Sequence, residues 1–342
     1  STVSIRSALD GIAASLPEPF NKSARQSWPL LIGFDSRERG ERQLVRAELG
    51  DRLTLSVERR ATPLGWAVAR GGLGINSALR SAADGVMISA RVDELDLDAW
   101  RRALRGNGGG GQEMPALALA GIELKAARLQ VYGQRLNMVD LSAAAVGGDW
   151  RGQLDSREAS GRFDWRGAGD GALHARLRHL RLGLGGGGDA EGAEDDALRR
   201  LPAVDLVVDE FVLRDKELGR LQVLARNRNR QWELETLALA NADGELQGSG
   251  VWRGGARPLT RLDFSIRSDN VGALLGRLGY ADALRDGKAE LSGEVDWQGS
   301  PLKVDYHSLD GKLVLSVEDG QFKRLEPGVG RLLGVLSLQA LP

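Results

Sequence analysis

Histidine is the side chain most often used near neutral pH for both proton transfer and metal binding. The sequence has three histidines: His174, His179 and His307. His174 and His179 are five residues apart in a segment with strand periodicity, so they point to opposite faces of a sheet and do not share a metal ion. No cysteine is present, which excludes disulfides, thiolate catalysis and Cys-type zinc sites. These residues predict no metal centre and no cofactor.

His307 is the histidine with a possible hydrolytic partner set, because Asp305 and Ser308 lie beside it. Ser, His and Asp are the residue types of a catalytic triad, which is defined by geometry and not by sequence position. A glycine-flanked serine elbow with the Gly-x-Ser-x-Gly pattern is missing. We interpret Gly248-Ser249-Gly250 as a turn between two strands. We therefore predict that the protein is not an enzyme and has no catalytic residues.

Four acidic residues cluster at Asp93, Glu94, Asp96 and Asp98. A calcium loop would need a loop glycine and a closing bidentate glutamate at set distances, and the cluster has neither. Acidic side chains are also favoured at the N-terminus of a helix, where they cap the backbone and complement the helix dipole. We interpret this cluster as the beginning of a short helix.

Glycine is abundant, with 46 residues in 342. The glycine-rich runs 106–111 and 185–188 lack the Lys-Ser/Thr and the strand-to-helix context of a phosphate-binding loop, and residues 71–74 fail the same test. We predict that the first two runs are flexible loops. The remaining glycines punctuate short alternating segments.

Opposite charges nearly cancel, since 46 Lys and Arg face 47 Asp and Glu for a net charge of −1. A general nucleic-acid binder carries an excess of positive charge, so we exclude that class. One local cluster, Arg226, Arg228 and Arg230, lies on one face of a predicted strand. Two interpretations stay open for it: a hairpin tip in water, or contact with anionic lipid headgroups.

Alternation of apolar and polar residues is the dominant pattern along the chain, as in residues 261–267 and 312–318. A period of two indicates a strand with one apolar and one wet face. Turn signals such as Asp243-Gly244 and Asp310-Gly311 separate these segments, which predicts an antiparallel meander and not β-α-β units. Short helices are predicted over residues 96–104, 193–201, 269–278 and 327–338. No apolar run approaches the roughly 20 residues that cross a bilayer.

Tryptophan recurs at the ends of these alternating segments. Trp150, Trp165, Trp252 and Trp297 are each followed by a polar residue and then by glycine. The spacing between the copies is irregular, so the pattern is not that of a strict solenoid. We predict that each tryptophan covers the apolar face at a strand end.

Half-apolar strands can close into a barrel, pack as a sandwich or curl into an open trough. Helices are few, and aromatic residues, at 5%, are too few to fill a wide barrel. We predict a mainly β fold, an elongated and curled antiparallel sheet that forms an open apolar groove with a few short helical inserts. Alternation alone fits a sandwich as well.

An open aliphatic face needs a ligand, and acyl chains suit it. The predicted lipid-binding residues are Leu53, Leu55, Val57, Leu173, Leu177, Val204, Leu206, Val208, Leu262, Phe264, Ile266, Leu291, Val295, Leu313, Leu315 and Val317.

The C-terminal third of the sequence resembles the AsmA-like family, and within it the YhdP branch. The resemblance covers about residues 240–342 and extends in style to the earlier strands. Its segments are Leu262-Asp263-Phe264-Ser265-Ile266, Asp269-Asn270-Val271-Gly272-Ala273-Leu274-Leu275, residues 279–293, Asp296-Trp297-Gln298-Gly299, Leu309-Asp310-Gly311-Lys312-Leu313, Gly320-Gln321-Phe322 and residues 326–339.

The resemblance implies a large envelope protein of Gram-negative bacteria, with an inner-membrane helix, a long periplasmic β-structure and an apolar groove. It implies movement of phospholipid between the inner and outer membranes. We expect this chain to be a periplasmic piece of such a protein, because it starts and stops within a pattern. Residues 1–240 would form a groove segment and residues 241–342 a truncated AsmA-like region.

The expected partners are phospholipid and, through parts beyond this chain, both membranes. The alternative is an assembly factor for outer-membrane proteins, in the manner of TamB-like proteins. Its sheet edges would pair with strands of client proteins in the envelope.

Overall fold

The computed structural model describes residues 2–37, 41–63, 65–106, 118–183, 201–228, 231–255, 257–278, 284–301, 304–319 and 321–322. Strands make up 68% of the described residues, which also include two short helices, so the prediction of a mainly β fold with short helical inserts is confirmed. The chain divides into two compact units, residues 1–164 and 165–342. The predicted division of family regions at residues 240–241 stays a prediction.

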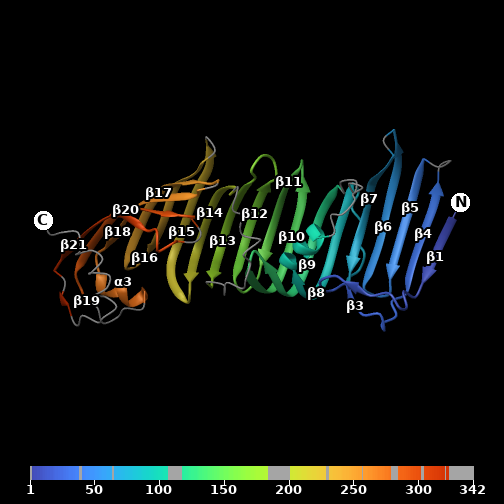
Figure 1. The fold of residues 1–342 in the computed structure, drawn as a ribbon, viewed down its shortest axis with the longest axis horizontal. Helices are drawn as coiled ribbons and strands as arrows, with labels where there is room; N and C mark the ends of the chain where they lie inside the picture. Colours follow the sequence, from blue (N-terminus) through green and yellow to red (C-terminus); the bar gives the residue numbers. More distant parts are fainter. Residues whose placement is uncertain are drawn as a thin grey trace. The chain divides into compact units, whose positions relative to one another are not determined.

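The first unit holds ten strands of the large sheet and one small strand pair, β2 with β3. Its strands follow one another in chain order (Figure 1). Its elements are β1 (Thr2–Ser7), β2 (Ala14–Ser15), β3 (Asn21–Lys22), β4 (Leu30–Arg37), β5 (Arg42–Leu49), β6 (Leu53–Thr62), β7 (Gly65–Ile75), β8 (Gly85–Asp96), α1 (Leu97–Gly106), β9 (Leu119–Val131), β10 (Gln134–Val146), β11 (Asp149–Asp155) and β12 (Ala159–Arg166), which ends just past the division.

The second unit holds eight strands of the large sheet and the small pair of β19 with β22. Its elements are β13 (Ala172–Leu182), β14 (Ala203–Leu213), β15 (Lys216–Arg228), β16 (Gln231–Asn241), β17 (Gly244–Arg253), β18 (Leu259–Ser268), α3 (Val271–Leu278), β19 (Leu284–Arg285), β20 (Lys288–Gln298), β21 (Asp310–Glu318) and β22 (Gln321–Phe322).

Most strand pairs with a described register are antiparallel, but three of them are parallel: β7 with β8, β8 with β9, and β13 with β14. A parallel pair needs a connection that crosses back over the sheet, which a hairpin turn cannot supply. In the first unit, α1 lies in the connection from β8 to β9. The expectation that β-α-β units are absent is therefore wrong at this point, because the short insert is itself a crossover.

Two turn predictions are wrong for a local reason. Gly248-Ser249-Gly250 lies in the middle of β17, and Asp310-Gly311 begins β21. Glycine in these positions permits close approach of the neighbouring strand: a Cβ on Gly250 would lie 2.3 Å from the carbonyl oxygen of Arg261. Asp243-Gly244 does belong to a tight turn, since Asn241 pairs with Gly244 across the β16–β17 hairpin.

Both described helices begin where the sequence predicts. Asp96 Oδ1 accepts the N–H of Ala99 at 2.7 Å at the start of α1. Asn270 Oδ1 accepts the N–H of Ala273 at 3.0 Å at the start of α3. Each contact satisfies one backbone donor that the first helical turn leaves unpaired. The predicted helices over residues 193–201 and 327–338 and the glycine-rich runs 106–111 and 185–188 lie largely or wholly outside the described residues.

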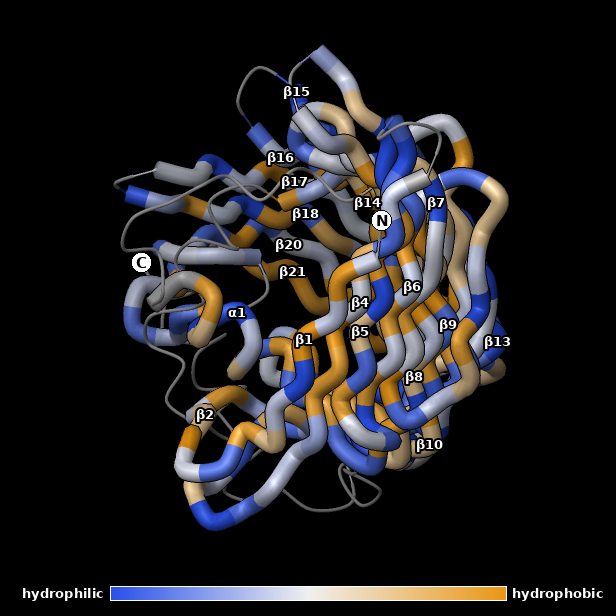
Figure 2. The backbone as a smooth tube through the Cα atoms, turned by 90° about the vertical axis from the view of Figure 1, so that its right-hand side faces the viewer, coloured by the Kyte–Doolittle hydropathy of each residue, from blue (hydrophilic) through white to orange (hydrophobic). Residues whose placement is uncertain are grey.

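Alternation gives each unit a sheet with two different faces, and Figure 2 shows hydrophobic and hydrophilic residues alternating along β4, β5 and β6. The polar face carries cross-strand ion pairs. Arg267 Nη2 lies 3.0 Å from Glu290 Oε1, and Arg261 Nε lies 3.2 Å from Glu294 Oε1. Such exposed pairs contribute roughly 0–1 kcal/mol each. Their main effect is to keep this face in water.

The buried cores lie along the apolar face of each unit. In the first unit the core comprises Val92, Leu124, Ala126, Leu129 and Val139. In the second unit, one cluster is formed by Val208, Phe211 and Leu221, and another by Ala225, Trp232 and Trp252. Many apolar residues around these clusters are only partly buried. Most of this face thus keeps some accessible surface.

Candidate functional site

Thirteen of the sixteen predicted lipid-binding residues lie in the second unit, and strand register brings all thirteen to one face of its sheet. Registered partners on adjacent strands point to the same side. One row of partners runs through Leu177, Val208, Leu221, Leu239, Leu246, Ile266, Leu291 and Leu315. A second row runs through Ala175, Leu206, Val223, Leu237, Gly248, Phe264, Gly293 and Leu313. We call this surface the apolar face of the second unit.

The remaining predicted residues of this unit extend the same face. Leu173 pairs with Val204, and Leu262 pairs with Val295, which places all four in a third row. Val317 pairs with Ala289 next to Leu315. Sequence reasoning missed the contributions of β15 and β16 to these rows. Leu221 and Val223 of β15 alternate in the same way, and so do Leu237 and Leu239 of β16, so part of the signal was present. A register shift between Leu234 and Leu237 interrupts the alternation on β16.

Exposure rises across the face from β14 to β21. Val208 is fully buried, whereas Leu313, Leu315 and Val317 are 38%, 43% and 37% exposed. The predicted residues of β18 and β20 between them are partly buried. All nine residues of β21 are exposed. The apolar rows therefore run from a packed region to an accessible one.

The other three predicted residues, Leu53, Leu55 and Val57, lie on β6 in the first unit. They share a face with residues of the flanking strands: Leu55, for example, is in register with Ala47 on β5 and Leu73 on β7. Val57 is buried, and the two leucines are partly buried. These three residues form a separate apolar surface within their own unit.

The glycines of residues 71–74 permit another segment of the chain to pass close to β7. A Cβ on Gly72 would lie 1.9 Å from the carbonyl oxygen of Arg80, and a Cβ on Gly74 would lie 2.6 Å from that of Ser77. The segment 77–80 thus runs directly over β7 on its way to the parallel strand β8. Arg80 then pairs with Glu123 on β9 at 2.7 Å.

A row of indoles closes one end of the apolar face of the second unit. Trp232 pairs with Trp252, Trp252 with Thr260, and Thr260 with Trp297. All four side chains are buried. The prediction that tryptophan covers strand ends is met here at Trp252 and Trp297. We call these four residues the Trp row.

The residue types of a triad near His307 form a local turn. Ser308 Oγ donates to Asp305 Oδ2 at 2.7 Å, and the backbone N–H of His307 donates to Asp305 Oδ1 at 3.1 Å. The Ser308 hydroxyl lowers the pKa of Asp305, followed by the His307 backbone N–H. In a triad the serine would donate to the histidine, so this arrangement is not that of an activated nucleophile.

His174 belongs to an ion-pair group on the polar side of β13 and β14. Its Nδ1 lies 3.0 Å from Asp205 Oδ2, and Arg176 Nη1 lies 2.8 Å from Asp205 Oδ1. The hydrogen bond from Arg176 is the largest of the effects that lower the pKa of Asp205. Across the described residues, no group of three or more His, Asp or Glu side chains is placed to hold a metal ion.

The arginine cluster of β15 is neutralised by the next strand. Arg228 Nη2 lies 2.9 Å from Glu235 Oε1, and Arg226 Nη1 lies 3.4 Å from the same oxygen. Glu233 adds a further contact to Arg228 at 3.6 Å. Arg230 lies outside the described residues. These ion pairs favour the interpretation of a solvated hairpin over a headgroup site.

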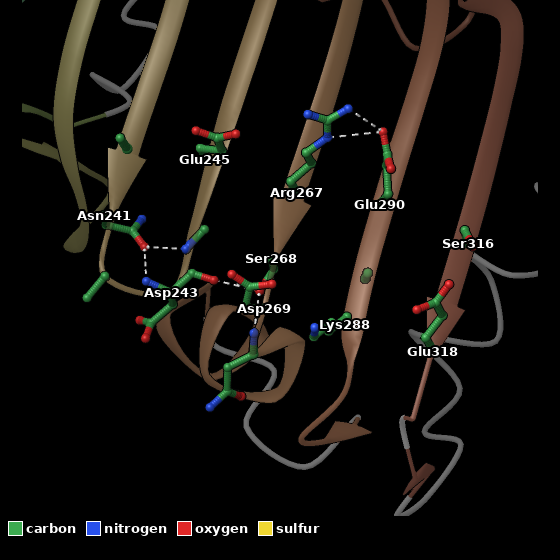
Figure 3. A pocket seen from close by; sticks show the side chains of 15 residues that line it. Asn241, Asp243, Glu245, Arg267, Ser268, Asp269, Lys288, Glu290, Ser316 and Glu318 are labelled. Atoms are coloured by element: carbon green, nitrogen blue, oxygen red, sulfur yellow. Dashed lines mark hydrogen bonds and ion pairs between the residues drawn. The ribbon is translucent and has the colours of Figure 1, made fainter.

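A cavity of about 560 Å³ lies on the polar side of β17, β18, β20 and β21, near the start of α3 (Figure 3). Asn241 Oδ1 accepts the backbone N–H groups of Asp243 and Gly244 at 2.9 and 3.2 Å, and Ser268 Oγ donates to the carbonyl oxygen of Asp243 at 2.5 Å. Charged and polar side chains make up most of its lining, which does not suit acyl chains. The registered row Glu245, Arg267, Glu290 and Ser316 in its lining lies on the polar side of the sheet, opposite to the apolar face.

Comparison with known proteins identifies the family. A family model described as "YhdP protein" matches residues 1–342. The chain belongs to the YhdP family. The resemblance seen in the C-terminal third thus extends over the whole chain. No curated protein and no solved structure gave a match.

YhdP family membership implies an AsmA-like envelope protein. Within the described ranges, no helix has the length and apolarity needed to cross a membrane.

Proposed function

We propose that this chain is a segment of a lipid-transfer protein and that the apolar face of its second unit carries the acyl chains of phospholipid. The observation that carries the proposal is the unbroken apolar row from Val208 to Leu315, which keeps accessible surface along most of its length. A face packed against a second sheet would be buried throughout. Family membership supports the same conclusion.

The physical role of such a face is to replace the bilayer interior. Exposure of an acyl chain to water costs roughly 0.8 kcal/mol per CH₂ group, so a lipid leaves a membrane readily only for another apolar surface. Leucine, valine and isoleucine side chains offer that surface, and their contacts with an acyl chain need no particular orientation. The opposite face, with its ion pairs, stays in water. Movement of lipid along the rows then needs no covalent chemistry, in keeping with our prediction of a non-enzyme.

The partners in this proposal are phospholipid and, by way of regions outside this chain, the inner and outer membranes. The envelope location follows from the family, and the path between membranes is our inference from the face. The direction of lipid transport would be set by regions outside this chain, since the sheet presents the same aliphatic side chains along each row.

Photo-crosslinking in cells that produce the protein tests the proposal. A photoreactive residue replaces Leu315, and the matched control replaces the adjacent Val314, which is also apolar, is 66% exposed and points to the other face. We expect phospholipid adducts at position 315 and few at position 314, although position 314 is the more exposed. Equal lipid labelling at both positions would refute the face-specific proposal. Adducts to protein at position 315 would favour the assembly-factor alternative.

A further inference from the structure

The Trp row contains a buried hydrogen-bond donor without an acceptor. Among the described residues, two side-chain groups are buried and lack a hydrogen-bond partner: the Ser89 hydroxyl and the Trp252 indole N–H. An unpaired buried donor costs about 1–3 kcal/mol, so such groups are rare and need an explanation. Trp252 lies on the apolar face to which the proposed function assigns the lipid.

The other donors of the row are satisfied by backbone carbonyl groups from two flanking segments. Trp232 Nε1 donates to the carbonyl oxygen of Pro202 at 2.9 Å. On the other side, Trp297 Nε1 donates to that of Ser300 at 3.0 Å, and Thr260 Oγ1 donates to that of Gly299 at 2.9 Å. Trp252 stands between these two groups in the register, and neither segment supplies it with an acceptor.

The surface around Trp252 suits the part of a phospholipid where the acyl chain joins the glycerol. Gly250, two residues earlier on the same face, has no side chain, and Leu234 and Leu262 flank it in register. The face runs from Trp252 to Leu246 over about 20 Å at the usual rise per residue. One leaflet of a bilayer core is about 15 Å thick, half of the roughly 30 Å total. An acyl chain therefore fits along the strand with its ester end at the Trp row.

We propose that the Trp252 indole N–H donates to the ester carbonyl oxygen of a bound acyl chain, so that the Trp row sets where the glycerol end of the lipid stops on the face. This inference rests on the proposed function. A carbonyl oxygen is the acceptor that satisfies the other three donors of the row. Indole rings are also enriched where membranes change from hydrocarbon to headgroup, because the ring is apolar and its N–H is a donor. The N–H is shielded from solvent in the lipid-free chain, so the carbonyl enters as neighbouring apolar side chains shift.

The test compares ester-linked with ether-linked lipid. Purified protein is titrated with diacyl phosphatidylethanolamine and with its dialkyl ether analogue, which lacks the carbonyl oxygens but keeps the chains and headgroup. We expect wild type to bind the ester lipid about threefold to tenfold more tightly, the range for one net hydrogen bond. Trp252→Phe keeps a buried ring and removes the donor, so it should bind the ester and the ether lipid with nearly equal affinity.

Two controls distinguish failure of this inference from failure of the proposed lipid-transfer function. Trp297→Phe removes a donor that already has an acceptor, so it should lower thermal stability but keep the preference for ester lipid. Trp252→Phe removes the same ring volume but no hydrogen bond, so it should lower thermal stability less than Trp297→Phe does. If wild type binds both lipids equally, or Trp252→Phe keeps the ester preference, the inference is wrong while the proposed function stands. If wild type binds neither lipid, the proposed function fails as well.

Discussion

At the scale of single residues, Asp98 shows how a carboxylate can serve structure in place of chemistry. Its two oxygens accept the backbone N–H groups of Tyr132 and Gly133, each at 2.9 Å, and so fix the β9–β10 turn to α1. We expect Asp98→Ala to lower the free energy of unfolding by about 1–3 kcal/mol, because both turn donors lose a charged acceptor. Asp93→Ala, at an exposed position of the same acidic cluster, should change it by less than about 0.5 kcal/mol. Denaturant unfolding of both variants measures the difference, and equal losses would contradict this role.

Asp205 gives a pH dependence at the same scale. Its pKa is lowered in the folded chain by Arg176 first and by His174 as well. The stability it contributes is therefore complete above the unfolded carboxyl pKa of about 4 and is lost as the pH falls through the lower folded value. Because the side chain is 42% exposed, the contribution is under about 1 kcal/mol.

We expect Asp205→Asn to be slightly less stable than wild type at pH 7 and equal to it near pH 2. Chemical unfolding across this pH range measures the gap. Asp209→Asn, at an exposed position of the same strand, is the matched control for the loss of one carboxylate charge. A gap that persists unchanged at pH 2 would show that the carboxylate charge of Asp205 is not its source.

Individual residues also mark what the sequence could and could not reveal. The acidic cluster indicated the beginning of α1 because a cap acts on the next few residues. The second role of Asp98 was hidden, since its partners lie 34 and 35 positions away. Likewise, Arg226 and Arg228 looked like free cations until pairing with β16 brought Glu235 to them. The unpaired Trp252 donor is a property of the whole row and leaves no local signal.

At the scale of elements, the β7–β8 crossover depends on missing side chains. We expect Gly72→Ala to lower the free energy of unfolding by about 1–3 kcal/mol, because the Cβ of the alanine would overlap the Arg80 carbonyl group. Gly33→Ala, on β4, meets no atom within 4 Å and should be neutral or slightly stabilising. Thermal unfolding compares the two, and a harmless Gly72→Ala would show that segment 77–80 does not depend on this contact.

The elements themselves were largely predictable, because period two is a strong signal for a half-buried strand. The alternation in residues 261–267 and 312–318 placed Leu262 and Leu313 on strands with the correct parity. Strand direction was not predictable for β8, β9 and β14, since it depends on where a connection crosses the sheet. Glycine misled the turn assignment at 248–250, because close strand approach and tight turns both favour it.

At the scale of the whole molecule, a ligand that covers an accessible apolar face must stabilise the folded chain. Binding adds about 2.7 kcal/mol to the free energy of unfolding when the free lipid is at 100 times its Kd. We expect delipidated protein to gain thermal stability on addition of short-chain phosphatidylethanolamine below its micellar concentration. Glycerophosphoethanolamine, which has the headgroup but no acyl chains, should give no shift. An equal shift with both compounds would place recognition at the headgroup and count against the apolar face.

The order of strand pairing has a consequence for how the chain folds. In the registers of both units, nearly every strand pairs with one that precedes it closely in the sequence. The longer connections within the first unit are residues 8–29, between β1 and β4, and residues 97–118, between β8 and β9. Contacts between neighbours in sequence close short loops, which lowers the entropic barrier to folding. Each strand can thus dock on a template that already exists when it arrives. A chain with this property can fold from its N-terminus while its C-terminal part is still being made, and its growing edge is shielded by the next strand to emerge.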